Sequence, residues 1–215
     1  MINKYLNYLQ EGYLFSGKTI SIDLDKFESG ESNKLIVVGI SGAGKSTLGT
    51  YLSKKYKCGF NELDICSRLA MSSGEHNAYK YNMEIASNIP LFKKFHNKCF
   101  KPALLSNKRE ILEGAIFQSY YLVPSTRPLV NKYPVIILGT SALKAVWDRT
   151  QRSLAREKHK NHNLKTHLKK LQIGLDLNFR YLQKYIDGFK KERIKAGGNV
   201  KEFKVPKLKG AIRLW

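Results

Sequence analysis

The chain is poor in acidic residues, in long apolar runs and in cysteine. Only 17 Asp and Glu stand against 38 Lys and Arg in 215 residues, a formal net charge of +21. No apolar run approaches the roughly 18 residues of a membrane span, and polar residues interrupt the first eight positions, unlike a secretory signal. The three cysteines, Cys58, Cys66 and Cys99, form no CxxC pair, which is typical of a reducing compartment. We therefore expect a soluble cytoplasmic protein without a membrane segment.

Ligands for a structural zinc ion are also scarce. Three of the five histidines, His159, His162 and His167, lie in a lysine-rich stretch. No cysteine or carboxylate accompanies them at the spacing of zinc ligands. The pattern argues against a zinc site.

The positive charge is concentrated in the last third of the chain. Residues 144–215 contain twenty Lys and Arg against six Asp and Glu, an excess of fourteen. Such a field attracts polyanions, so we expect nucleic acid as a partner. A solvated cationic surface is the alternative, because net charge indicates non-specific affinity only.

The most informative motif runs from Gly39 to Thr47. It reads GISGAGKST and fits the phosphate-binding pattern GxxxxGK[ST]. An apolar strand predicted at 34–38 precedes it and a helix predicted at 45–55 follows it, which is the context that the motif requires. The alternative is a glycine-rich turn that binds nothing.

The motif predicts a site for a nucleoside triphosphate and Mg²⁺. Backbone N–H groups and the helix N-terminus would surround phosphate oxygens. Lys45 would reach the β- and γ-phosphates, and the Ser46 hydroxyl would bind Mg²⁺. The predicted nucleotide-binding residues are Gly39, Ser41, Gly42, Ala43, Gly44, Lys45, Ser46 and Thr47.

Strands alternate with helices after residue 33, which predicts an α/β fold with a parallel sheet and helices on both faces. Further strands are expected at 59–64, 111–114 and 134–139, with an irregular loop over 118–134 and a helix over 168–189. Residues 1–33 are expected to form an N-terminal extension with a short helix at 3–11 and a strand at 19–24. Residues 34–215 form one domain, with a basic helical region at about 141–195.

Two acidic residues are predicted at the carboxyl ends of strands, where parallel sheets bind ligands. Asp64 can accept or align the proton of an acceptor hydroxyl, and Arg68, one helical turn later, can bind an anionic acceptor. Asp64 can instead be only a helix N-cap. Glu113 can order Mg²⁺-bound water or make a simple surface ion pair.

Three further arginines are candidates for contact with the transferring phosphate or the acceptor. Arg149 and Arg152 follow the fourth predicted strand at i, i+3 spacing, so a mobile segment can bring them over the phosphates. A solvated basic helix face is the alternative. Arg127 can touch the acceptor or lie on a loop surface.

The motif, the acid Asp64 with Arg68, the Leu112-Glu113-Gly114 triplet and the Arg149–Arg152 pair together resemble P-loop kinases of the adenylate, shikimate, gluconate and polynucleotide kinase group. The resemblance covers residues 34 to about 160. It implies a three-layer P-loop NTPase sandwich with strand order 2-3-1-4-5, ATP-Mg²⁺ as donor and a lid after the fourth strand. Asp64 would then serve the acceptor hydroxyl, Arg68 an acceptor phosphate, and Arg149 or Arg152 the lid. Residues 5–12 also resemble small proteins of tailed bacteriophages, which would place the protein in the host cytoplasm.

Three functions remain open on the sequence. The leading one is an ATP-dependent kinase that phosphorylates a hydroxyl of an anionic acceptor, either a polynucleotide end, a hydroxymethylated base in DNA, or a nucleotide. A small metabolite is the alternative acceptor. The second function is a DNA-binding P-loop ATPase, and the third is a structural protein with a vestigial P-loop.

Overall fold

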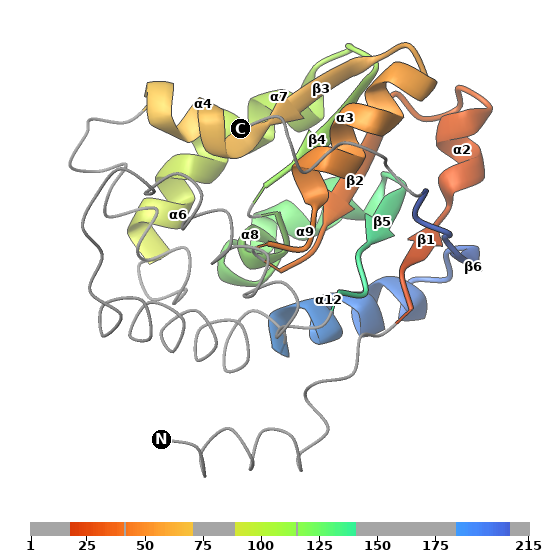
Figure 1. Ribbon diagram of the computed structural model, residues 1–215. Coiled ribbons are helices and arrows are strands. Elements are labelled where there is room, and N and C mark those ends of the chain that lie inside the picture. Colours follow the sequence, from red (N-terminus) through yellow and green to blue (C-terminus); the bar gives the residue numbers. More distant parts are fainter. Residues whose placement is uncertain (1–17, 41, 71–88, 115, 141–183, 207–215) are drawn as a thin grey trace, which may run out of the picture.

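The computed structural model describes residues 18–40, 42–70, 89–114, 116–140 and 184–206. Strands and helices alternate through this part of the chain, so it is an α/β protein (Figure 1). The strands are β1 (Ile20–Ile22), β2 (Lys34–Val38), β3 (Gly59–Glu62), β4 (Glu110–Glu113), β5 (Val135–Ile137) and β6 (Val200–Glu202). The helices are α2 (Leu24–Glu28), α3 (Lys45–Lys55), α4 (Leu63–Ala70), α6 (Ile89–Phe95), η1 (His96–Phe100), α7 (Lys101–Leu105), α8 (Ile116–Leu122), η2 (Pro124–Thr126), α9 (Arg127–Asn131) and α12 (Lys184–Lys195).

The described strands form one mixed sheet in the order β3-β4-β2-β5-β1-β6. The pairs β3–β4, β4–β2 and β2–β5 are parallel, whereas β1 pairs antiparallel with both β5 and β6. The predicted order 2-3-1-4-5 in a parallel sheet is therefore wrong for this sheet. The N-terminal strand β1 occupies the edge of β5, where a fifth parallel strand was expected, and β6 then pairs with β1.

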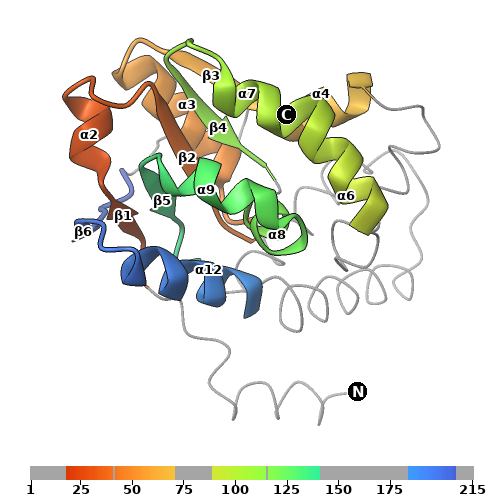
Figure 2. The ribbon, with the colours of Figure 1, turned by 180° about the vertical axis from the view of Figure 1, so that it is seen from behind.

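Helices cover both faces of this sheet because its central strands are apolar on both sides. Leu35 and Val37 of β2 pack with α3 residues Leu48 and Leu52. Ile36 belongs to the second core cluster, on the other face. Figures 1 and 2 show α3 on one face and α8 and α9 on the opposite one. A fully buried five-residue strand with alternating partners is typical of a central parallel strand.

The described part of the C-terminal region packs onto this core. Ile186 and Phe189 of α12 are 4% and 0% exposed, and the Phe189 ring meets the Tyr120 ring of α8 edge to face at 5.0 Å. Arg193 of α12 is also buried and donates hydrogen bonds to Asn131 Oδ1 and Tyr133 O. Burial lowers the pKa of Arg193. At least this stretch of the basic C-terminal third is part of the domain.

The irregular loop predicted for 118–134 is wrong. Helix α8, the 3₁₀ turn η2 and helix α9 occupy most of this stretch. Pro124 and Pro128 lie in the first turns of η2 and α9. A proline there removes no helical hydrogen bond, since the first N–H groups of a helix have no intrahelical acceptor. The prolines begin these helices and do not disrupt them.

The strand predicted at 59–64 is also too long. β3 ends at Glu62 and α4 begins at Leu63, so Asp64 lies in the first helical turn and not at a strand end. The Leu63 side chain is fully buried in the core, which fixes the first turn of α4 against the sheet. A carboxylate in this turn is favoured by the partial positive charge of the helix N-terminus.

The amino-terminal edge of the parallel strands contains a buried ion pair. Lys34, the first residue of β2, is 0% exposed and lies opposite Glu110, the first residue of β4. Its Nζ donates to Glu110 Oε1 and Ser106 Oγ at 2.7 Å each, and to the Lys108 carbonyl. All three ammonium protons thus have acceptors, which a buried cation requires. This polar cluster stabilises the sheet edge opposite residues 39–44, the loop of the predicted phosphate-binding motif, which is called the P-loop below.

Acid is expected to destabilise the fold through His96. This histidine of η1 is 3% exposed, and its Nδ1 lies 2.9 Å from Thr126 Oγ1. Burial, followed by the charge of Lys101, lowers the pKa of His96 below its usual 6.5. The unfolded chain therefore takes up a proton as pH falls through about 6.5 while the folded protein does not. The free energy of unfolding should fall by up to about 1.4 kcal/mol per pH unit between pH 6.5 and the lowered pKa of the folded state.

Urea unfolding at pH 7.5 and pH 5.5 measures this effect. His96→Gln cannot titrate, so the variant should lose less stability than the wild type between the two pH values. An equal loss in both proteins would assign the acid sensitivity to other groups.

Candidate functional site

The P-loop joins β2 to α3 through two glycines with left-handed backbone. Gly42 has φ of 90°, and Gly44, the N-cap residue of α3, has φ of 89°. A residue with a Cβ rarely adopts this conformation, so both positions require glycine for backbone reasons. Among the described residues, no side chain caps the N-terminus of α3. Its first N–H groups are therefore free of a side-chain cap at the end of the loop.

Three P-loop and β4 side chains meet beside this loop. Glu113, the last residue of β4, is 2% exposed. Its Oε2 accepts a hydrogen bond from Ser46 Oγ at 3.2 Å, and its Oε1 lies 3.3 Å from Lys45 Nζ. Lys45 Nζ also donates to the Ile40 carbonyl at 3.4 Å. A buried carboxylate thus connects the lysine and the hydroxyl that the motif predicts as phosphate and Mg²⁺ ligands.

Sheet register explains why residues so far apart in sequence meet here. β2 and β4 are parallel neighbours, and Glu113 lies opposite Val37, one residue before β2 ends. The loop that follows Val38 therefore passes the carboxyl end of β4. This edge of the sheet is the one at which ligands bind in parallel α/β proteins.

The loop is supported from behind by β5 and the segment before β1. Gly39 packs closely, since a Cβ added there would lie 3.1 Å from Leu138 Cβ and 3.2 Å from Ala43 Cβ. Thr140 Oγ1 donates to the Ala43 carbonyl at 3.3 Å, and the Gly139 N–H donates to Thr19 Oγ1 at 3.0 Å. Neither threonine was predicted from the sequence, because neither belongs to a motif and only the sheet order brings them to the loop.

Asp64 lies next to the residue that follows Glu113. Gly114 has φ of 149°, and a Cβ on it would lie 3.0 Å from Leu63 Cβ and 3.4 Å from Asp64 Oδ1. The first turn of α4 therefore touches the carboxyl end of β4. This contact brings a second carboxylate to the sheet edge that holds Glu113.

Arg127 lies in a different environment. Its Nε donates to the Tyr120 carbonyl at 3.1 Å, and its guanidinium stacks over the Tyr120 and Tyr121 rings at 5.5 and 5.9 Å. These contacts attach the N-terminus of α9 to α8. The described contacts of Arg127 do not include the P-loop or Asp64.

Four other predicted site residues lie outside what the structure describes. Ser41, Arg149 and Arg152 fall in undescribed segments, and of Arg68 only the backbone, within α4, is described. Thr47 lies half-buried in the first turn of α3.

The buried thiol of Cys99 in η1 contacts the half-buried Cys66 of α4 near this edge. Burial, followed by a hydrogen bond between the Cys99 and Cys66 thiols, raises the pKa of Cys99 to about 12. A thiol with this pKa is protonated at neutral pH and is a poor nucleophile. Cys99 is therefore not a candidate nucleophile.

Neither a cluster of metal ligands nor a known relative defines what the site binds. Within the described ranges, no three His, Cys, Asp or Glu side chains gather as a metal site, and no helix there is long and apolar enough to cross a bilayer. No protein-family model and no curated protein matches the chain. The chemistry of the site therefore has to be argued from its own residues.

Proposed function

We propose that the protein is an ATP-dependent kinase that transfers the γ-phosphate to a hydroxyl of an anionic acceptor. The observation that supports this most strongly is the contact of Lys45 and Ser46 with the buried carboxylate of Glu113. Lys45 and Ser46 begin helix α3 directly after the glycine loop, and Glu113 ends the neighbouring strand β4. Lysine, hydroxyl and acid in this relation to a P-loop are the parts that phosphoryl transfer uses.

The residues present fit a magnesium nucleotide. The N–H groups at the start of α3 can bind phosphate oxygens, and Lys45 can exchange Glu113 for the β- and γ-phosphates. Ser46 would ligate Mg²⁺, and Glu113 would hold one of its waters. A protein normally binds Mg²⁺ through one or two side chains together with substrate phosphates, so a cage of three acids is not needed. When bound, the ion would neutralise charge that develops on the transferring phosphate.

The sheet supports the same assignment. Counted from the P-loop strand β2, the parallel strands stand in the order second, third, first, fourth, with helices on both faces. We assign this part to the P-loop NTPase fold, with β1 and β6 as additions at one edge. The predicted lid, with Arg149 and Arg152, would follow β5 in this fold.

Asp64 is our candidate for the acceptor hydroxyl. It is the first acid of α4 and lies beside Gly114, at the same sheet edge as Glu113. A carboxylate here can align or accept the hydroxyl proton. Arg68, one turn later on α4, would bind an acceptor phosphate. Given the net charge of +21, we propose a polynucleotide or nucleotide as acceptor.

The direct test uses ATP labelled in its γ-phosphate, with Mg²⁺. The acceptors are single-stranded DNA, duplex DNA, hydroxymethyl-base DNA, RNA, nucleosides and nucleotides in separate reactions. We expect label to move to one class of hydroxyl acceptor. Release of inorganic phosphate alone, stimulated by DNA, would support an ATPase and exclude the kinase.

Asp64→Asn is expected to lower phosphate transfer about 10²-fold while ATP binding is unchanged, because the amide cannot take a proton from the acceptor. Transfer rate and ATP affinity are measured separately, by labelled product and by titration. Asp187→Asn is the matched control, since Asp187 is likewise an acid in a first helical turn, that of α12. Wild-type transfer in Asp64→Asn would leave Asp64 only a role at the helix N-terminus.

A further inference from the structure

Residues 89–105 form one helical rod that packs against α4. Helix α6, the π-helical turn η1 and helix α7 follow one another directly, and the joining residues Phe95 and Lys101 have α-helical backbone angles. One side of the rod is buried, with exposed fractions of 7% or less. The buried residues are Phe95, His96, Cys99, Phe100, Ala103 and Leu104.

The π-helical turn sets which residues face solvent. The buried positions recur every four residues, and in a regular α-helix such a period would rotate about 40° around the axis at each step. The i→i+5 bonding of a π-turn takes more residues per turn and reduces this rotation. The positions on the other side of the rod keep the same four-residue period. Lys94 therefore aligns with Lys98, and Lys93 aligns with Lys101. These four lysines are called the lysine face below.

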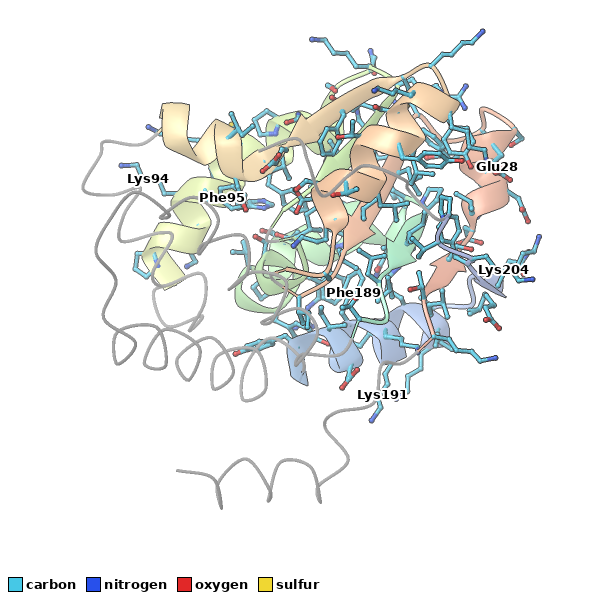
Figure 3. All side chains as sticks on the ribbon, in the orientation of Figure 1. Glu28, Lys94, Phe95, Phe189, Lys191 and Lys204 are labelled. Carbon is cyan, nitrogen blue, oxygen red and sulfur yellow. The ribbon has the colours of Figure 1, made fainter. Side chains whose placement is uncertain are left out.

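The lysine face lies on a stretch of sequence without acidic residues. From Ile89 to Arg109 the sequence has no Asp or Glu. Lys93, Lys98 and Lys101 are exposed and Lys94 is half-buried. By contrast, Asp187 and Glu192 lie among the lysines of α12. Figure 3 labels Lys94 and Phe95 on α6, far from the β6 edge near Lys204.

The rod lies next to the helix that carries Asp64. η1 packs against α4, and the thiol of Cys99 in η1 contacts Cys66 of α4, two residues after Asp64. The lysine face therefore belongs to an element in direct contact with the proposed acceptor helix.

We propose that the lysine face binds the phosphodiester backbone of a polynucleotide and so holds the acceptor beside α4. The role as acceptor site rests on the kinase proposed above, whereas binding itself does not. Lys93 and Lys101 are eight residues apart, about 12 Å along the rod, enough to contact several consecutive phosphates. Lysine is depleted in the centres of protein interfaces, which are rich in aromatic and apolar groups. Among the rod residues whose exposure the structure describes, the large exposed apolar side chain is Leu105, at the end of the rod.

The test measures binding of fluorescein-labelled 20-mers, single-stranded and duplex, by anisotropy without nucleotide. Four substitutions, Lys93→Gln, Lys94→Gln, Lys98→Gln and Lys101→Gln, should lower affinity for at least one 20-mer at least about tenfold at 100 mM salt. The slope of log affinity against log salt should become shallower by about three, since each phosphate contact on a single strand contributes roughly 0.7.

The control variant removes the same charge elsewhere. Lys54, Lys191, Lys195 and Lys204 are all exposed, and their change to Gln gives the same net charge. Affinity should change less than about threefold, because only the long-range field is reduced. Equal losses in the two variants would show diffuse attraction and overturn the lysine face. Displacement of the 20-mer by poly-glutamate at equal charge concentration would also overturn it, in favour of an acidic protein partner.

Failure of the kinase proposal gives a different result. If the lysine face binds DNA but no label moves from ATP to an acceptor, binding by the lysine face is supported and the kinase proposal is contradicted. If label reaches an acceptor at the same rate in the wild type and in the Lys93/Lys94/Lys98/Lys101 variant over a range of oligonucleotide concentrations, the kinase stands and the face is excluded as the acceptor site.

Discussion

Lys45→Met is expected to lower γ-phosphate transfer at least about 10³-fold and to weaken ATP binding. The Lys45 ammonium group lies at the start of α3, 3.3 Å from Glu113 Oε1, where it can bind the negatively charged phosphates during transfer. Removal of one preorganised group that stabilises transition-state charge lowers the rate about 10²–10³-fold. The effect should be larger here, because a full positive charge stabilises that charge more strongly than a neutral hydrogen-bond donor does. Single-turnover transfer and nucleotide titration measure the two effects.

The same substitution has a structural cost that must be separated from catalysis. A methionine side chain in place of Lys45 would leave the buried Glu113 carboxylate without its cation, and removal of one partner of a buried pair costs about 3–5 kcal/mol. The double variant Lys45→Met/Glu113→Gln removes both charges and should recover much of this stability but no transfer. Transfer near the wild-type rate in a folded Lys45→Met protein would contradict the proposed role of the P-loop.

Local sequence signals predicted the elements that hold the site. The apolar run 34–38 and the helix 45–55 coincide with β2 and α3. The glycine motif follows the strand and precedes the helix, so these boundaries depend only on residues that are close in sequence. Glu113 was also predicted at the carboxyl end of a strand, and the parallel pairing of β2 and β4 brings it to Lys45 and Ser46.

Features that depend on distant partners could not be predicted in this way. β1 lies beside β5 because Ile20 pairs with Ile137, more than one hundred residues later. Lys34 is a charge at a strand start, where solvent exposure is usual, and it is buried only because Glu110 lies opposite it. Thr140 donates a hydrogen bond to the carbonyl of the P-loop residue Ala43, and Thr19 accepts one from Gly139 N–H, and neither contact has a sequence pattern.

Glu113→Gln is expected to have opposite effects on Mg²⁺-dependent transfer and on metal-free nucleotide binding. The amide can still accept the hydrogen bond from Ser46, but it cannot attract Lys45 or a hydrated cation. Transfer at a fixed Mg²⁺ concentration should fall about 10²-fold, the lower end for loss of one electrostatic group. ATP without Mg²⁺ should bind more tightly, because a buried carboxylate no longer repels the phosphates or competes for Lys45.

Glu110→Gln is the matched control for this prediction. Glu110 is the other buried carboxylate of β4, pairs with Lys34 at 2.7 Å and lies at the opposite end of the strand. Its loss should lower the free energy of unfolding, whereas the folded variant should keep its transfer rate and Mg²⁺ dependence. If both variants bind metal-free ATP like the wild type and lose transfer equally, Glu113 acts through stability alone. If only Glu113→Gln binds metal-free ATP more tightly and needs more Mg²⁺ for transfer, its carboxylate acts in the nucleotide site itself.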